Sequence, residues 1–217
     1  MAADCRRVMG DRFVALVAYG PTRAAVFATQ LPADDLAALT PLADRWHREG
    51  LETPLLLSPE EFRRSLDTFP LEYGALLDCH EVIDGTRPFG DDRPSDADLR
   101  RACEVHAKGF LIHLRQGWLH AADRHDEQAV LLQQSAAPLR ALLRNIARLT
   151  GQAPADDQAL AAFGETHLGL PVPVVADILG LDADPAGAGR LLSAPDFMPA
   201  YLRTAERLWA HVDQWRR

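Results

Sequence analysis

The sequence predicts an α+β protein, in which a small mixed β-sheet with its helices precedes an all-α helical bundle. Two apolar runs rich in Val and Phe lie near the N-terminus, and turn residues separate them. Beyond residue 95, apolar residues recur every three or four positions, which is the period of an amphipathic helix. Between the two patterns, residues 84–94 are rich in Gly, Pro and Asp, which is typical of a domain boundary. We therefore expect an α+β domain over residues 1–94 and a helical bundle over residues 95–217.

The two apolar runs near the N-terminus predict a pair of strands. They cover residues 12–19 (RFVALVAY) and residues 24–30 (AAVFATQ). Only residues 20–23 (GPTR) separate them, and Gly and Pro are turn residues. We expect the strands to pair directly, as a hairpin with Gly20 and Pro21 in its turn.

A helix and a short strand are expected next. Residues 31–50 begin with a Pro near the helix start, carry Asp34 and Asp35 in the electropositive first turn, and end at a Gly. The apolar residues 54–57 predict a short buried strand.

The last elements of the N-terminal half are a short helix and two extended segments. Residues 58–61 (SPEE) combine a Ser cap, a Pro at the first helical position and two acids in the first turn. They predict a helix that ends near residue 65. Residues 69–77 predict another strand, and residues 82–83 a further extended piece.

Long amphipathic helices are expected in the C-terminal half. Residues 95–98 (SDAD) begin the first with a start like a capping box, and a second spans residues 127–150, where Pro138 should kink or break it. The predicted inward stripe of the first helix comprises Leu99, Cys103, His106, Phe110, Leu114 and Gly117. The remaining helices are expected at residues 156–163, 174–179 and 195–217.

The composition is that of a globular protein. The chain has 217 residues, of which 47% are hydrophobic and 25% charged. No apolar stretch is long enough for a membrane span, and the N-terminus has no secretory signal. The three cysteines form neither a disulfide framework nor a zinc pattern, which favours the cytoplasm.

The charge is unevenly distributed along the chain. Residues 1–98 hold 18 acids and 10 arginines, whereas residues 99–217 hold 13 acids and 13 basic residues. Because the acidic half would repel a phosphate backbone, we expect no nucleic-acid partner.

Several short motifs follow one another in a recognisable order. They are SPEE at 58–61, Asp67-x-Phe69-Pro70-x-Glu72, Ile83-x-Gly85, the stretch 108–116 and YLRTAERLWAHVDQW near the C-terminus. This ordered set resembles bacterial proteins of the nucleotidyltransferase fold, the polymerase-beta-like superfamily, fused to a C-terminal helical bundle. The resemblance spans nearly the whole chain.

The chemistry that the resemblance implies depends on two motifs. A Gly-Ser after the first strand holds the nucleotide phosphates, and an Asp-x-Asp on the next strand holds two Mg²⁺ ions. Here Gly20 is present, but Pro21 replaces the serine, and the second strand begins Arg23-Ala24-Ala25 without an acid. Of the carboxylates, only the third would remain, as Glu72.

The resemblance and these departures predict a pseudoenzyme, a nucleotidyltransferase-like protein that has lost metal-dependent transfer and acts as a binding or interaction module. No catalytic residue, metal site or cofactor is assigned. The residues expected to line a polar pocket are Gly20, Arg23, Glu72, Lys108 and Arg115. The partner would be an unidentified protein or a small molecule, with no membrane involved, and the aromatic C-terminus favours a homodimer.

Two enzymatic alternatives stay open. The chain could transfer a nucleotidyl group to a small molecule with displaced metal ligands, in which case Mg²⁺ would be the cofactor. It could also be a helical ribonuclease, because Arg101 and His106 match a loose Arg-x4-His pattern. His106, His113 and His120 recur every seven residues, about 10 Å along a helix, which is too far apart for one metal ion.

Without Mg²⁺, a cation should accompany the remaining carboxylate. Arg23 lies beside the degenerate turn, so we expect its guanidinium to pair with Glu72 or Asp67.

Overall fold

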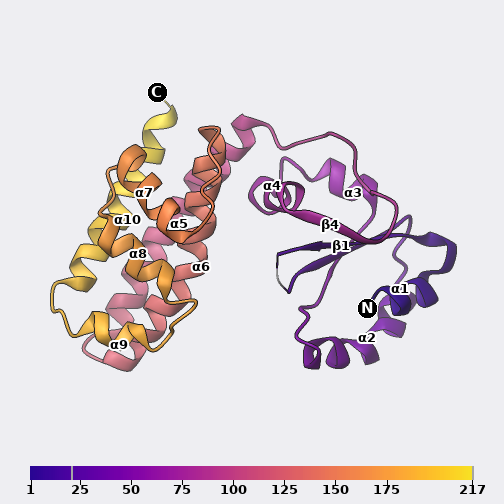
Figure 1. Ribbon diagram of the computed structural model, residues 1–217, viewed down its shortest axis with the longest axis horizontal. Coiled ribbons are helices and arrows are strands. Elements are labelled where there is room, and N and C mark those ends of the chain that lie inside the picture. Colours follow the sequence, from indigo (N-terminus) through magenta and orange to yellow (C-terminus); the bar gives the residue numbers. More distant parts are fainter. Residues whose placement is uncertain (21, 217) are drawn as a thin grey trace. The chain divides into compact units, whose positions relative to one another are not determined.

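The protein has an α+β fold made of two compact units, Met1–Ser95 and Asp96–Arg217 (Figure 1). The computed structural model describes residues 1–20 and 22–216. The sheet belongs entirely to the first unit, and the second is helical. Each unit has its own apolar interior, and the two are described separately.

The sheet of the first unit has the strand order β3-β2-β1-β4. Its strands are β1 (Phe13–Tyr19), β2 (Ala24–Ala28), β3 (Leu55–Leu57) and β4 (His80–Gly85). β1 pairs antiparallel with both β2 and β4, and β2 pairs parallel with β3. The parallel pair requires a crossover connection, which α2 (Ala33–Arg48) supplies.

The expected hairpin of the first two strands is confirmed. Ala18 lies opposite Ala24, and the N–H of Tyr19 donates to the carbonyl of Arg23 at 3.0 Å. The chain therefore turns within residues 20–23. Pro21, which we expected in this turn, lies outside the described residues.

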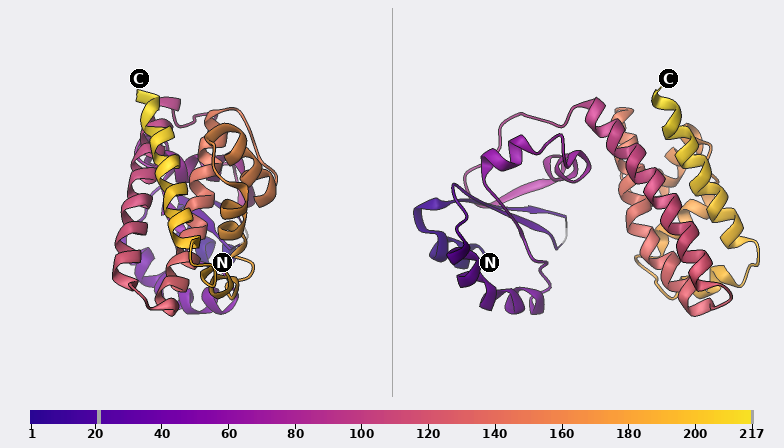
Figure 2. Two further views of the ribbon diagram at one scale, coloured as in Figure 1. Left: turned by 90° about the vertical axis from the view of Figure 1, so that its left-hand side faces the viewer. Right: turned by 180° about the vertical axis from the view of Figure 1, so that it is seen from behind.

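Short helices accompany the sheet (Figure 2). Besides α2 they are α1 (Ala2–Met9), the 3-10 turn η1 (Gly10–Arg12), α3 (Pro59–Arg64) and α4 (Pro70–Asp78). The predicted start of α3 is confirmed as a full capping box, because Ser58 accepts from the N–H of Glu61 while the Glu61 carboxylate accepts from the N–H of Ser58. The sequence pattern did not indicate α1.

Residues 69–77, predicted as a strand, are a helix instead. Pro70 occupies the first helical position of α4, where its missing N–H costs nothing. Tyr73, Leu76 and Leu77 then reach the interior from one side of the helix. A short apolar run does not distinguish a buried strand from a buried helix, so the sequence alone is ambiguous here.

β3 is also less enclosed than expected. Leu55 is exposed, and the other two residues of the strand are half-buried, because β3 lies at the edge of the sheet.

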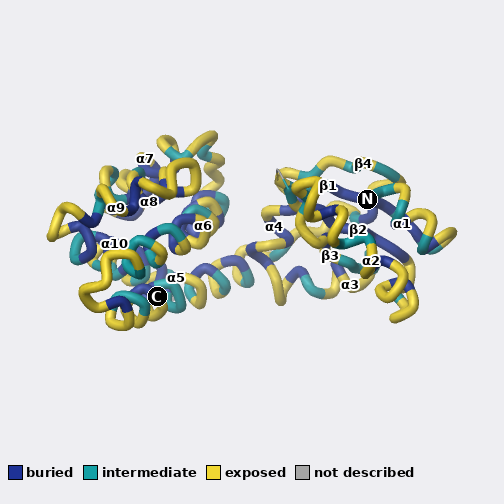
Figure 3. The backbone as a smooth tube through the Cα atoms, turned by 90° about the horizontal axis from the view of Figure 1, so that it is seen from below, coloured by how far each residue is buried: buried dark blue, intermediate teal, exposed yellow. Residues whose placement is uncertain are grey.

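Both faces of the sheet are covered by apolar side chains. Figure 3 shows, along the backbone, which residues are buried. On one face Val26 packs in a cluster with residues of α1 and α2, including Trp46. On the other face Phe27 packs with Phe62 of α3 and with α4. All five residues of β2 are buried, so β2 is the most enclosed strand of the sheet.

Charged side chains join α1 and the turn η1 to α2. Arg12 donates two hydrogen bonds to Asp35, at 2.5 and 2.8 Å, and Asp35 is buried. Asp4 of α1 accepts hydrogen bonds from Arg45 and from the indole of Trp46, and these donors lower the pKa of Asp4 to about 2. The predicted placement of Asp35 in the first turn of a helix is confirmed, and its pairing with Arg12 adds a tertiary role.

One glycine of the sheet is required by a close backbone approach. Gly85, at the end of β4, has a φ of +90°, and a Cβ there would lie 2.1 Å from the carbonyl oxygen of Val14. A larger residue would separate β4 from β1 at this point.

The second unit is built around two long helices, α5 (Asp96–Ala121) and α6 (His125–Leu149), with α10 (Phe197–Asp213) packed against α5. The shorter elements are α7 (Asp157–Leu168), α8 (Val172–Gly180), α9 (Gly187–Leu192) and the 3-10 turn η2 (Gln214–Arg216). The hydroxyl of Tyr201 donates to Ser135 at 2.8 Å in the interior, and burial raises the pKa of Tyr201.

Two expectations for the long helices are corrected. α6 continues through Pro138 and is not broken there; Pro138 is exposed, as is Gln134, the residue four positions earlier whose carbonyl loses its helical partner. The buried stripe of α5 uses Ala107 and Leu111, whereas His106 is exposed.

The cysteines are all free thiols. Burial raises the pKa of Cys5 to about 11 and that of Cys103 to about 12, whereas Cys79 is exposed.

Introducing an acid into β2 should disrupt the first unit. Val26 is fully buried between the sheet and α2, so a carboxylate there would be desolvated without a partner. We expect Val26→Asp to lower the free energy of unfolding by about 4 kcal/mol or more. Urea unfolding, followed by the fluorescence of Trp46 in a variant whose other three tryptophans are replaced by Phe, would measure this.

The matched control is Ile83→Asp in β4, where the native side chain is 51% exposed. Its cost should stay below about 1 kcal/mol. Equal costs for the two variants would contradict the described burial of β2.

Candidate functional site

The hairpin between β1 and β2 holds two of the predicted site residues. Gly20 has a φ of +85°, and a Cβ there would lie 3.7 Å from the Arg23 guanidinium. That guanidinium lies over the ring of Tyr19, with its central carbon 5.3 Å from the ring centroid. The end of the hairpin is therefore occupied by a cation–π pair.

The predicted ion pair of Arg23 with Glu72 or Asp67 is wrong. Among the described residues Arg23 makes no ion pair, because the hairpin places Tyr19 next to it. Glu72 is exposed in the first turn of α4, on a helix and not on a strand.

The strand that would carry an acid pair is apolar and enclosed. β2 reads Ala-Ala-Val-Phe-Ala from Ala24 to Ala28, and the strand is buried on both faces. In residues 1–20 and 22–216, no group of three or more His, Cys, Asp or Glu side chains is arranged to hold a metal ion.

The other two predicted site residues, Lys108 and Arg115, lie on α5 and contact α10. The Lys108 ammonium is 3.6 Å from the ring centroid of Trp209, and Arg115 pairs with Glu206 at 2.7 Å. Of the five predicted site residues, the structure brings together Gly20 with Arg23, and it ties Lys108 and Arg115 to the same neighbouring helix.

With this geometry in hand, the chain was compared with known proteins. No family model, curated protein or solved structure matches it. The chemistry of its sites must therefore be argued from its own residues. Over the described part of the chain, no helix is both long and apolar enough to cross a membrane.

The face of α5 opposite its buried stripe carries exposed apolar side chains. Val105, Ile112 and Leu119 are 63%, 41% and 83% exposed. Their spacing of seven residues places them in one row about 20 Å long. We call this row the α5 stripe.

Basic side chains and imidazoles flank the α5 stripe. Arg101, Lys108 and Arg115 each precede a stripe residue by four positions, so they lie along its side. The three histidines at 106, 113 and 120 follow the stripe residues by one position and are exposed. From residue 105 to the end of α5 there is no acid. Arg115 is paired with Glu206 of α10 and Arg101 with Asp98, so Lys108 is the flanking basic residue that makes no ion pair with another described residue.

A pocket of about 460 Å³ opens where α6, α7 and α10 end. Its apolar lining consists of Ile146, Leu149, Leu168 and Trp215. Its polar lining consists of Arg100, Thr150, His167 and His211. We call it the α7 pocket; it contains no acid in its lining and lies wholly within the second unit.

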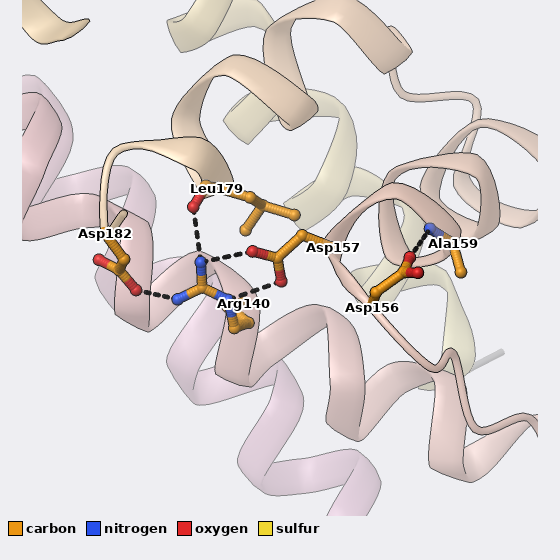
Figure 4. A network of polar contacts seen from close by, with 6 residues as sticks. All are labelled: Arg140, Asp156, Asp157, Ala159, Leu179 and Asp182. Carbon is orange, nitrogen blue, oxygen red and sulfur yellow. Dashed lines mark hydrogen bonds and ion pairs between the residues drawn. The ribbon is translucent and has the colours of Figure 1, made fainter. Parts of the chain in front are cut away.

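A network of polar contacts positions α7 (Figure 4). Arg140 of α6 donates two hydrogen bonds of 2.8 Å to Asp157, the first residue of α7, and one of 2.6 Å to the carbonyl of Leu179 in α8. It also pairs with Asp182, just beyond α8. Asp156 caps α7 by accepting from the N–H of Ala159 at 2.8 Å. One guanidinium thus joins three segments, including the helix that forms one wall of the pocket.

The pocket residues were not predicted from the sequence. Arg100, His167 and His211 belong to three different helices and share no motif, so their meeting depends on tertiary packing. The only local sign was Trp215, which the sequence placed in an aromatic C-terminus.

Removing the Arg140 side-chain charge should destabilise the second unit. Arg140 is mostly buried, and Arg140→Met would leave Asp157 without its donor. Because Asp157 and Asp182 are partly exposed, we expect a loss of about 2–3 kcal/mol, less than for a fully buried pair. Urea unfolding at pH 7 would measure it, and Arg190→Met, which breaks an exposed pair with Asp184, should cost below about 0.5 kcal/mol.

The cost of Arg140→Met should also depend on pH. Hydrogen bonding from Arg140 lowers the pKa of Asp157 below its ordinary value. The stabilisation is therefore present above the ordinary Asp pKa of about 4 and is lost as the pH falls through the lowered value. We expect the difference between wild type and variant to shrink below pH 4; a difference that stays constant down to pH 2 would contradict the ion pair.

Proposed function

We propose that this protein is a nucleotidyltransferase-like scaffold that has lost metal-dependent nucleotidyl transfer and acts as an interaction module. Its partner would be a protein that presents an acidic amphipathic helix to the α5 stripe. The same proposal places the protein in the cytoplasm, in keeping with its three free thiols.

The observation that carries the first part is the direct pairing of β1 with β2. Phosphate-binding loops need several backbone N–H groups that are free to face a ligand. In the hairpin the N–H of Tyr19 is bonded to Arg23, and the cation–π pair of Arg23 lies beside it. A pair of carboxylates on β2 would point into the apolar clusters that cover the sheet.

The α5 stripe supports the second part. Three large apolar side chains in one row at heptad spacing are what a partner helix packs against. The charge of the flanks favours an acidic partner, because Lys108 lies beside the row with its ammonium over the uncharged ring of Trp209, and no acid of α5 follows residue 104. An acidic helix is attracted to this face and a basic one is repelled.

Nucleotide binding tests the loss of transfer. We expect no measurable heat when the chain is titrated with ATP, GTP, CTP or UTP in the presence of Mg²⁺. The double variant Pro21→Ser with Ala24→Asp should not restore activity, because the loop itself is absent. Micromolar binding with release of pyrophosphate, in wild type or variant, would overturn this part.

A designed helical peptide tests the α5 stripe. The probe is a 21-residue amphipathic helix with Leu at its a and d positions and Glu at e and g, labelled for fluorescence anisotropy. We expect binding that weakens at least about tenfold in the variant Ile112→Ser with Leu119→Ser, since two buried apolar contacts are lost. Val130→Ser on α6, at a similarly exposed Val, should leave the affinity unchanged.

Charge and oligomeric state complete this test. The same peptide with Lys in place of Glu should bind at least about tenfold more weakly. The proposal would be contradicted if the Lys peptide bound as tightly as the Glu peptide. It would also be contradicted if the variant Ile112→Ser with Leu119→Ser bound the Glu peptide as tightly as the wild type. A dimer seen by light scattering and abolished by Ile112→Ser would show that a second copy covers the stripe.

A further inference from the structure

The α7 pocket has the chemistry of a ligand site. We propose that it binds a small organic anion with a flat apolar body, of the class of aromatic carboxylates. The proposal rests on residues of the second unit alone and is independent of the function proposed for the α5 stripe.

The floor of the pocket favours an apolar body. Ile146 is fully buried and Leu168 nearly so, and Leu149 and the Trp215 indole extend this surface. Binding is favourable when the apolar atoms of a ligand bury this surface, whereas a bare inorganic ion buries no apolar area there. A volume of about 460 Å³ is within the range of small-molecule sites and large enough for a bicyclic aromatic acid.

The rim favours a single negative charge. Arg100 is exposed at the start of α5 and makes no ion pair or hydrogen bond with another described residue. A planar guanidinium matches a carboxylate through two parallel hydrogen bonds. Since Arg100 is the one permanent charge in the described lining, a monoanion is neutralised there and a dianion is not.

The imidazoles add directional polar groups in fixed positions. His167 stacks on Phe163 with 4.7 Å between ring centroids, and its Nε2 lies 2.8 Å from the side-chain nitrogen of Gln152. His211 contacts Trp215 edge-to-face at 6.0 Å, and burial lowers the pKa of His211, so its ring is neutral at pH 7. Rings held in this way orient a ligand at little entropic cost.

The charge pattern favours an anion over the other ligand classes. A cationic ligand would meet Arg100 and no carboxylate, and a neutral one would gain no charge-assisted hydrogen bond from the guanidinium. A flat body suits the pocket because three of its lining side chains, His167, His211 and Trp215, are themselves planar rings.

Calorimetry with three matched probes tests the proposal. Indole-3-acetate should bind to the full chain, whereas its neutral amide and the cation tryptamine should bind at least about tenfold more weakly. The C2–H proton signals of His167 and His211 should shift on addition of indole-3-acetate. The proposal would be overturned if the amide bound as tightly as indole-3-acetate. It would also be overturned if indole-3-acetate showed no binding up to about 5 mM, which corresponds to a Kd weaker than millimolar.

Neighbouring arginines supply the matched variants. Arg100→Gln should weaken indole-3-acetate binding at least about tenfold. Arg101→Gln, one position along the same helix, removes a charge that pairs with Asp98 outside the pocket and should leave the affinity unchanged. Leu149→Asp at the floor should also abolish binding. An equal effect of the two arginine variants would show that only the overall charge matters, and would contradict the site.

Discussion

The backbone pairing of β1 with β2 is the interaction on which the first unit depends. β1 lies between β2 and β4, and both of its ladders are antiparallel. Because only residues 20–23 separate them in the sequence, β1 and β2 pair along most of their length. The sheet can then be covered on both faces by apolar clusters, which leave no room for polar chemistry in its middle. β2 reads Ala-Ala-Val-Phe-Ala, so none of its own side chains could serve as a metal ligand.

In the second unit, charged side chains join the helices that surround an apolar core. Arg140 joins α6 to α7 and to the end of α8. Lys108 and Arg115 perform a similar task for α10. Two of the three cations predicted to line a polar pocket, Lys108 and Arg115, therefore hold helices together. Arg100, which makes no ion pair or hydrogen bond with another described residue, lines the α7 pocket.

Features set by neighbouring residues could be predicted from the sequence, and features set by tertiary contacts could not. The hairpin and the helix start at Ser58 depend on a few adjacent residues, and the structure confirms both predictions. α4 was mistaken for a strand because its apolar residues fit both periods. The inward face of α5 was assigned one position off at His106, because Ala107 is a weak hydrophobic signal. The α7 pocket draws on segments more than 100 residues apart, and no local pattern indicates such a meeting.

The distribution of thiols has a consequence for the chemistry of the whole chain. Cys5 and Cys103 are fully buried with raised pKa values, so they supply almost no thiolate at neutral pH. Cys79, at the junction of α4 and β4, is the exposed one. Oxidants and alkylating reagents should therefore modify the folded protein at a single position. An oxidising medium would yield disulfide-linked pairs of chains through Cys79, because both other thiols stay buried.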